Sequence, residues 1–143
     1  MAKVALITDT HAGVRNDNPA FHEYQKCCYD WFFNYIDTHS IKHVVHLGDI
    51  FDRRKYINFL SAKRCREDLL DPLEDRGIET HIIQGNHDSY YKDTHEVNAL
   101  DELVVGRYRF INTYSVPDII NIDGLDIQIM PWITASNRDF AMD

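Results

Sequence analysis

Three short segments of this 143-residue chain carry side chains that can bind metal ions, and each segment follows a short apolar run. The first contains Asp9 and His11, the second contains Asp49, and the third contains Asn86 and His87. If the apolar runs are parallel strands, their carboxyl ends meet at one edge of one sheet, where these side chains converge. Carboxylate, imidazole and amide oxygen are common ligands of divalent cations. The pattern therefore predicts a metal site at that edge.

Each segment taken alone also has a simpler interpretation. Asp9 and His11 are two positions apart and would share a face of a continuing strand, but such a pair is also typical of a solvated loop. Gly48 lets the chain turn sharply before Asp49, whose two carboxylate oxygens can bridge two cations, although Gly-Asp is also a common turn. Gly85 permits close backbone approach at the third segment. The argument for a metal site rests on the three segments together.

The elements that must position these segments follow from the spacing of apolar residues. We expect strands over 3–8, 42–47 and 79–84, a polar loop over 13–19, and helices over about 19–38, about 58–77 and 94–105. Pro72 should kink or interrupt the second helix because it lacks an amide hydrogen. Residues 108–132 indicate short antiparallel strands around Pro117 and an Asp123-Gly124 turn. Alternating strands and helices predict an α/β fold with a parallel-sheet βαβαβ core.

Steps of three and four residues define the faces that these helices should bury. In the first helix the stripe comprises Phe21, Tyr24, Cys28, Trp31, Phe32, Tyr35 and Ile36. We expect it to pack in the core, with an oligomer surface as the alternative. The second helix should bury Phe59, Ala62, Cys65, Leu69, Leu70 and Leu73, and the third Val97, Leu100, Leu103 and Val104.

Composition narrows the classes of protein to consider. The 23 acidic and 15 basic side chains give a net charge of −8, which argues against binding nucleic acid through a broad basic surface. No stretch approaches the ~18 apolar residues of a membrane span, and the first strand leaves no room for a signal peptide. We therefore expect a cytoplasmic protein with no membrane contact. Cys27, Cys28 and Cys65 lack Cys-x-x-Cys spacing and predict free, mostly packed thiols.

The ordered set Asp-x-His, Gly-Asp-x-x-Asp-Arg and Gly-Asn-His-Asp resembles the calcineurin-like metallophosphoesterase superfamily over nearly the whole chain, from Val4 to Thr134. The runs 48–52 (Gly-Asp-Ile-Phe-Asp) and 130–132 (Met-Pro-Trp) resemble its SbcD/Mre-eleven branch of DNA repair nucleases, most closely phage recombination endonuclease subunits. Arg54 and Asp88 stand where the protein-phosphatase branch usually has glycine and glutamate, which favours the nuclease branch.

This resemblance implies roles for the residues that match. Asp9 and His11 would bind a first metal ion, Asp49 would bridge both ions, and Asn86 would bind the second. His87 would approach the scissile phosphate and protonate or stabilise the leaving oxygen. The implied cofactors are two divalent metal ions, manganese in such nucleases, which would neutralise the phosphate and activate water.

Six neighbouring residues are candidates for supporting roles. Asp52 and Asp88 are suited to orient His11 or His87, since metal-bound imidazoles generally donate their second N–H to a carboxylate, and the alternative is a turn or cap. Positive charge beside the metal ions can hold DNA phosphates, and tyrosine can stack on an unpaired base. The DNA-binding candidates are Arg53, Arg54, Lys55 and Tyr90, with Tyr91 and Lys92 beside them, and the alternative is a solvated loop.

The family completes its site with histidines in downstream Gly-His and Gly-His-x-His motifs, which this sequence does not contain. Its other histidines, predicted to be packed or on the surface, are His22, His39, His43, His46, His81 and His95. We therefore expect residues 1–143 to be the N-terminal part of a single nuclease domain, a metallophosphoesterase sandwich incomplete at its C-terminus and inactive alone.

Three functions remain open at this point. The first is a nuclease subunit of a DNA recombination and repair complex, with DNA, a coiled-coil ATPase of the SMC type and a second copy as candidate partners. The second is a related phosphoesterase acting on a nucleotide or phosphoprotein, which suits the acidic charge. The third is a catalytically incomplete fragment that only binds a metal or a partner.

Overall fold

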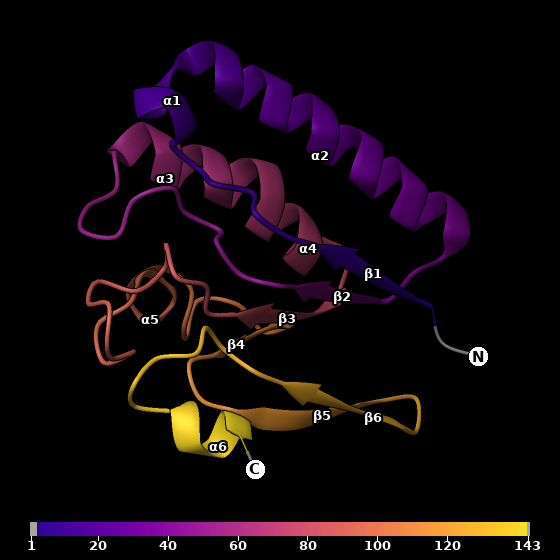
Figure 1. The fold of residues 1–143 in the computed structure, drawn as a ribbon. Helices are drawn as coiled ribbons and strands as arrows, with labels where there is room; N and C mark the ends of the chain where they lie inside the picture. Colours follow the sequence, from indigo (N-terminus) through magenta and orange to yellow (C-terminus); the bar gives the residue numbers. More distant parts are fainter. Residues whose placement is uncertain (1–2, 143) are drawn as a thin grey trace.

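The computed structural model describes residues 3–142 and contains two sheets (Figure 1). The larger sheet is parallel with strand order β1-β2-β3-β4, and the smaller is an antiparallel β5-β6 hairpin. The strands of the larger sheet are β1 (Val4–Ile7), β2 (His43–His46), β3 (Glu79–Ile83) and β4 (Ile111–Tyr114). The hairpin consists of β5 (Asp118–Ile122) and β6 (Leu125–Ile129).

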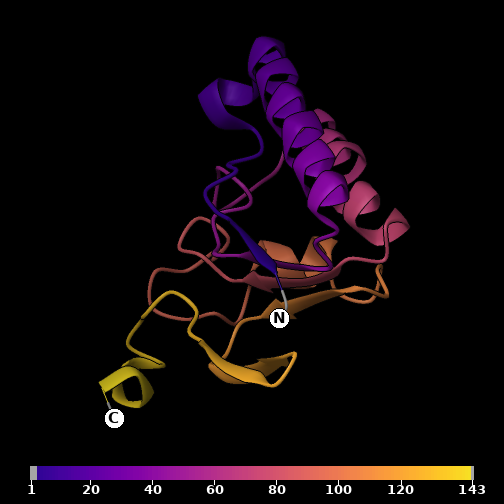
Figure 2. The same ribbon diagram turned by 90° about the vertical axis from the view of Figure 1, so that its right-hand side faces the viewer.

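The long helix at residues 19–39 and the helical segments at residues 59–75 cover one face of the parallel sheet, and the hairpin and the C-terminal helix at residues 138–142 lie on the other side (Figures 1 and 2). The segments are α1 (Val14–Asp17), α2 (Pro19–His39), α3 (Phe59–Cys65), the π-helical turn η1 (Arg66–Leu70), α4 (Asp71–Asp75), α5 (Ala99–Leu103) and α6 (Arg138–Met142). None of the helices described is long and apolar enough to cross a membrane.

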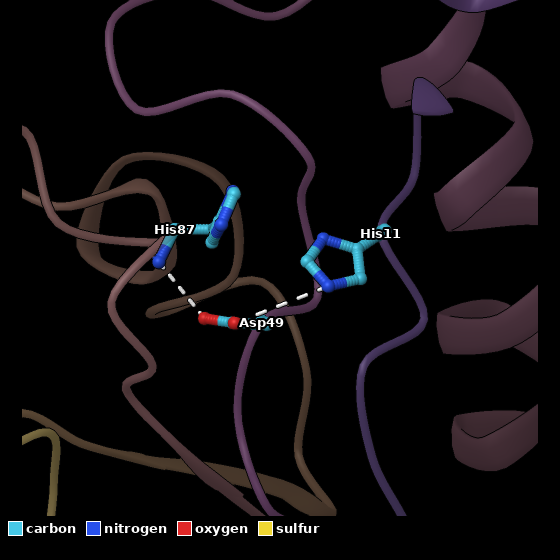
Figure 3. Close-up of side chains that lie close together, drawn as sticks. All are labelled: His11, Asp49 and His87. Carbon is cyan, nitrogen blue, oxygen red and sulfur yellow. Dashed lines mark hydrogen bonds and ion pairs between the residues drawn. The ribbon is translucent and has the colours of Figure 1, made fainter. Parts of the chain in front are cut away.

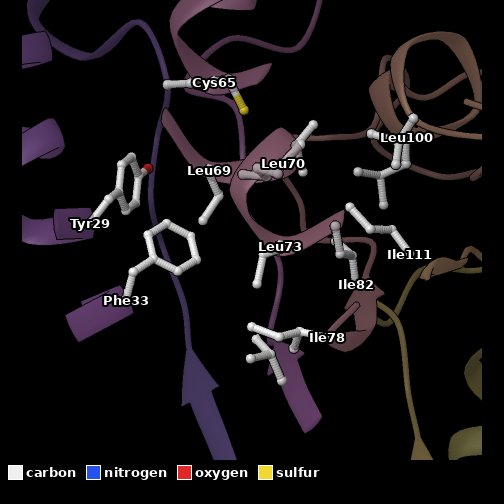
Figure 4. Packing of buried hydrophobic residues seen from close by; sticks show 14 of the residues in the cluster. Tyr29, Phe33, Cys65, Leu69, Leu70, Leu73, Ile78, Ile82, Leu100 and Ile111 are labelled. Carbon is white, nitrogen blue, oxygen red and sulfur yellow. The ribbon is translucent and has the colours of Figure 1, made fainter. Parts of the chain in front are cut away.

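Successive side chains of the central strands belong to two separate hydrophobic clusters, one on each face of the sheet. Val44 and Ile82 belong to the cluster packed against the helices (Figure 4), whereas Val45 and Ile83 belong to the cluster packed against the hairpin. Successive side chains of a strand point to opposite faces, so a sheet covered on both sides has continuous apolar runs. This explains the consecutive apolar residues Val44-Val45 and Ile82-Ile83 in the two central strands.

The parallel βαβαβ core and the Asp123-Gly124 turn are confirmed. The expectation of antiparallel strands throughout 108–132 is wrong for β4, because β4 pairs in parallel with β3. The connection from β3 to β4 is long and includes α5, which is what a parallel crossover needs. Only β5 and β6 form the expected antiparallel ribbon.

The predicted buried face of α2 is wrong for most of its residues. Tyr24 and Trp31 are each 67% exposed, and the buried residues are His22, Tyr29, Phe33 and Ile36. Aromatic residues surround much of this helix, so the same spacing fits two neighbouring faces. The cysteines are free as predicted, but Cys27 and Cys28 on this helix are exposed and only Cys65 is buried.

The remaining differences arise from local capping and turn chemistry. The segment predicted as a loop at 13–19 contains the turn α1, in which residues 15–17 have positive φ. The second helix is interrupted as predicted, but the break begins one turn before Pro72, at η1, and Phe59 is 94% exposed. The third begins only at Ala99, because the Asn98 side chain caps it there, and Val97 is therefore exposed.

Candidate metal centre

The three metal-binding segments lie together at the carboxyl ends of β1, β2 and β3. Backbone bonds continue beyond the strands: Asp9 N donates to Gly48 O at 3.1 Å, and His11 N donates to Asp49 O at 3.0 Å. The loops after β1 and β2 are therefore held side by side. This places the first two segments at one edge, as the parallel arrangement predicts.

Three of the candidate ligands have a backbone conformation that few residues adopt. Asp9, His11 and Asp49 have φ of 52°, 43° and 55°, in the left-handed region. Aspartate and histidine enter this region more readily than most residues, but it still costs free energy and is concentrated at functional sites. All three of these residues closely follow β1 or β2, so the strained conformations are gathered at the shared edge.

Two glycines let the second and third segments touch. A Cβ on Gly48, whose φ is 103°, would lie 2.8 Å from Gly85 Cα. A Cβ on Gly85 would collide with the Asp49 carboxylate and the Asp49 backbone N. Only glycine at these positions leaves room for the Asp49 side chain beside the third segment.

Side chains from all three segments converge on Asp49 (Figure 3). His11 Nε2 lies 3.9 Å from Asp49 Oδ2 and 3.4 Å from Asp9 Oδ1. One ligand atom each of His11, Asp49 and His87 lies within 4.8 Å of the others, a spacing that could hold a metal ion. The structure thus brings Asp9, His11, Asp49 and His87 into one cluster.

Asn86 lies beside this cluster. The chemistry of its side-chain amide bears on whether the cluster fits a cation. The amide lies between the Asp49 carboxylate and the Arg54 guanidinium. With its NH₂ group toward Asp49 it donates to Oδ2 at 3.0 Å, and its oxygen accepts from Arg54 Nη2 at 3.2 Å. Carboxylate and amide oxygens are also hard ligands, so Asp49 and Asn86 together offer the donor atoms that a divalent cation prefers. The residues present therefore fit a divalent cation.

His87 is fixed by two bonds that leave one ring nitrogen free to react. Its backbone N donates to Asp49 Oδ1 at 2.8 Å, and its Nδ1 lies 2.5 Å from the Asp52 carbonyl oxygen, which can only accept. Nδ1 therefore carries a proton in the neutral ring, and Nε2 has the free lone pair. This nitrogen can bind a cation or exchange a proton with a bound group.

Asp52 and Asp88 do different things although both were expected to orient histidines. Asp52 Oδ1 is 3.6 Å from His11 Nδ1, on the side of the ring opposite the nitrogen that faces Asp9 and Asp49. Asp88 is fully buried and instead accepts three backbone N–H bonds, from Asp49 at 2.9 Å, Gly85 at 3.0 Å and Phe51 at 3.1 Å. It holds the loops rather than an imidazole.

Charge and exposure are uneven across the centre. The Asp9 side chain is 60% exposed and that of Asp49 only 14%. A hydrogen bond from Thr8 is the main cause that lowers the pKa of Asp9. Burial raises the pKa of the Asp88 carboxyl to about 6, although its backbone N–H partners act in the opposite direction.

Sequence reasoning missed two side chains that support the first loop. His46 Nδ1 accepts from Gly48 N, so Nε2 carries the proton and donates to Thr10 Oγ1 at 3.0 Å. Burial lowers the pKa of His46 to about 4. Gln25, on α2, donates from Nε2 to the carbonyl oxygen of Thr10. No motif marks either residue; only the strand register and the helix position bring them there.

The DNA-binding candidates have different surroundings. Arg53 is bound within the chain, whereas Arg54 and Lys55 form a cationic group beside the site. Arg53 forms an ion pair with Asp17 at 2.7 Å and so holds the α1 turn. The Arg54 guanidinium lies 4.9 Å from the centre of the Trp132 ring, and its Nη1 is buried without a partner in the described part of the chain.

Beside this group, Lys55 lies 5.7 Å from the centre of the Tyr90 ring. Trp132 also lines a cavity of about 220 Å³ together with Asp9, Asp49 and Asn86. The Met130-Pro131-Trp132 run therefore forms one wall of the metal centre.

Comparisons with known proteins agree with this geometry. The sequence profile of the calcineurin-like phosphoesterase family matches residues 2–138. Exonuclease subunit 1 of Enterobacteria phage T4 is 33% identical over 135 residues, which make up 94% of this chain and 39% of that protein. The DNA double-strand break repair protein Mre11 of Sulfolobus acidocaldarius is 37% identical over 86 residues, 58% of this chain and 22% of that protein. The chain spans well under two thirds of either relative.

Proposed function

Because the chain belongs to the calcineurin-like phosphoesterase family, whose members bind divalent metal ions, we propose that it is the metal-binding part of a DNA nuclease subunit that hydrolyses phosphodiester bonds. The observation that carries the proposal is that Asp9, Asp49 and Asn86 line one cavity at the edge of the sheet, with His11 Nε2 3.4 Å from the Asp9 carboxylate and 3.9 Å from that of Asp49. The two relatives named as nuclease and repair proteins support DNA as the substrate. Such an activity would be exercised in the cytoplasm, of the host cell if a phage encodes the protein.

The ligand set suggests where each cation would be held. His11 Nε2 lies 3.9 Å from Asp49 Oδ2, and the Asn86 amide lies 3.0 Å from Oδ2 and 3.3 Å from Oδ1 of the same carboxylate. We propose that Asp49 bridges two ions and that these ions are manganese. Divalent cations held there would neutralise the phosphodiester and lower the pKa of the attacking water. Asp52 would keep His11 oriented through the nitrogen that does not face the cations.

His87 is the residue that we assign to proton transfer. Its Nδ1–H is bound to the Asp52 carbonyl, which fixes the ring and directs Nε2 away from the backbone. A protonated Nε2 can donate to the oxygen that leaves when the phosphodiester bond breaks. The edge contact with His11, at 4.8 Å between ring centres, keeps this nitrogen beside the metal ligands.

Phosphate contacts beyond the cations would come from Arg54 and Lys55. The Arg54 guanidinium packs on Trp132, which lines the cavity, and Lys55 lies beside Tyr90, which is exposed enough to stack on a base. Arg53 supports them indirectly, since its guanidinium is bound to the α1 turn. A local group of this kind reconciles DNA binding with a net charge of −8.

A related phosphoesterase that acts on a nucleotide or a phosphoprotein is the second candidate, and the acidic net charge favours it. Mn²⁺-dependent hydrolysis of linear duplex DNA, compared with a nucleotide and a phosphopeptide, separates the two. Hydrolysis of DNA that disappears in Asp49→Asn but persists in the exposed control Asp93→Asn supports the nuclease. Activity only on the nucleotide or the phosphopeptide contradicts it.

A chain that binds metal but cleaves none of these substrates would be the incomplete fragment. Calorimetric titration with Mn²⁺ identifies this case: the parent chain binds the ion, and Asp49→Asn binds it more weakly, although neither hydrolyses a substrate. A coiled-coil ATPase and a second copy remain proposed partners of the complete nuclease.

A further inference from the structure

Two histidines and a glutamate form a second cluster of metal-binding side chains, at the end of the sheet opposite the metal centre. His43 begins β2, and Glu79 and His81 lie at the start of β3. The parallel register pairs His43 with Glu79, so the three residues are neighbours on adjacent strands. Asp49 lies beyond the other end of β2. The cluster therefore shares no side chain with the metal centre.

All three side chains lie on the face of the sheet that the hairpin covers. Side chains alternate along a strand, so His43 shares a face with Val45, and Glu79 and His81 share one with Ile83. Val45 and Ile83 belong to the hydrophobic cluster packed against the hairpin. His81 itself is only 4% exposed. The two imidazoles thus lie at the margin of an apolar cluster, where their interaction with a charge is stronger than in water.

Both imidazoles direct an unpaired nitrogen toward the same carboxylate. His43 Nδ1 lies 3.2 Å from Glu79 Oε2, and His81 Nε2 lies 3.7 Å from Glu79 Oε1. Both nitrogens are buried, and neither forms a hydrogen bond of normal geometry with any of residues 3–142. Buried polar atoms are seldom left without a partner. Two such nitrogens that flank one carboxylate fit a cation, which can bind all three groups.

The surroundings of His81 suit a metal ligand. Its Nδ1 lies 2.7 Å from the Tyr114 hydroxyl. Burial is the main cause that raises the pKa of Tyr114, so the phenol stays neutral and can accept a bond from Nδ1–H. Burial also lowers the pKa of His81, which keeps its ring neutral at neutral pH. With the proton on Nδ1, the lone pair of Nε2 points toward Glu79, and the ring is held by its second nitrogen as in other metal-binding imidazoles.

We propose that His43, Glu79 and His81 form a second divalent-cation site and that its ion is zinc. Two imidazole nitrogens and one carboxylate are a ligand set that zinc takes in proteins, with water as the fourth ligand. Imidazole suits zinc, whereas the carboxylate and amide oxygens of Asp49 and Asn86 suit manganese. The two ends of the sheet would therefore select different ions.

The ligands have the freedom that one shared ion requires. The two nitrogens face different oxygens of the carboxylate, so the side chains must rotate a little for one ion to contact all three. The Glu79 side chain is 49% exposed and can make this movement. An ion held there would join the amino ends of β2 and β3 and stabilise the folded chain, because the unfolded chain does not keep the three ligands together.

Metal analysis of matched variants after equilibrium dialysis against Zn²⁺ tests the proposal. His43→Gln removes one nitrogen ligand at a partly exposed position, and this variant should hold one zinc ion fewer per chain than the parent. His39→Gln changes an exposed histidine on α2 and should hold as many as the parent. Both variants should bind Mn²⁺ at the metal centre as the parent does, so this test is independent of the proposed nuclease.

Nuclear magnetic resonance of the histidine ring nitrogens gives the same answer without a ligand substitution. Zn²⁺ should shift the signals of His43 Nδ1 and His81 Nε2 in the parent, and also in Asp49→Asn, in which the metal centre is weakened. Glu79→Gln should weaken zinc binding at this cluster about tenfold or more, since even residues that only position metal ligands have effects of this size. The same number of zinc ions in His43→Gln and the parent, or ring nitrogens of His43 and His81 that do not respond to Zn²⁺, overturns the proposal and leaves an ion pair between Glu79 and protonated histidine.

Discussion

Replacing Asp88 with alanine should destabilise the fold far more than replacing an exposed aspartate. The Asp88 carboxylate is the acceptor for three backbone N–H groups, a buried one from Phe51 and partly buried ones from Asp49 and Gly85. Each donor left without a partner costs about 1–3 kcal/mol, and partial relaxation leads us to expect a total loss of about 3–5 kcal/mol. Domains of this size are stable by only about 5–15 kcal/mol, so much of the stability would be lost.

Urea unfolding monitored by circular dichroism measures this loss as a lower midpoint at unchanged slope. Asp88→Asn should be intermediate, because its amide oxygen still accepts while its NH₂ group opposes one donor. Asp93→Ala, at an exposed position, should stay within about 0.5 kcal/mol of the parent. If Asp88→Ala costs no more than Asp93→Ala, the three bonds do not hold the loops as we describe.

Asp88→Asn also tests whether this carboxylate positions the loops for metal binding, in addition to stabilising the fold. Asp88→Asn, measured at a temperature where it remains folded, should bind Mn²⁺ about 10–100-fold more weakly, as for other residues that position metal ligands. Unchanged Mn²⁺ affinity in the folded variant would show that the loops find their geometry without this carboxylate.

Three further predictions follow from the centre. Gly85→Ala should displace the Asp49 carboxylate, since the added Cβ occupies its place, and calorimetric titration should find weaker Mn²⁺ binding than in the Gly106→Ala control, where nothing lies within 4 Å. The folded pKa of His46, about 4, lies below the value of 6.5 for the unfolded chain, so its contribution to stability is present above pH 6.5 and is lost as the pH falls toward 4. Urea unfolding should record a loss of up to about 3 kcal/mol in that window that His46→Gln lacks; an identical pH profile for the variant would exclude His46 as the cause. In the nuclease that we propose, Arg54→Glu should weaken DNA binding about tenfold or more, measured by fluorescence anisotropy, with little effect on hydrolysis of a small phosphodiester, and equal losses on both substrates would contradict a role in DNA binding.

The convergence of the three segments could be predicted from sequence because parallel strands leave little freedom. Once β1, β2 and β3 are parallel neighbours, Asp9, Asp49 and Asn86 must follow equivalent strand ends. The faces of α2 could not be predicted in the same way. Its aromatic residues satisfy helical spacing on two adjacent faces, and only packing against the sheet decides which face is buried.

The role of Asp88 was also beyond sequence reasoning. A carboxylate next to a candidate catalytic histidine suggests a partner for an imidazole, and nothing in the letters reveals that three amides point at it. The direction of β4, by contrast, could have been inferred. The sequence predicts a helix between β3 and β4, and a strand that follows such a connection is favoured to pair in parallel.

Backbone bonds and the Asp88 carboxylate hold the first two loops in place. This affects how the protein would take up cations. The ligand loops are ordered by contacts that no cation makes, unlike those of small zinc domains, whose folding is driven by metal. A chelator should therefore strip the centre without melting the chain. Binding of a divalent cation would then require little further ordering of the loops.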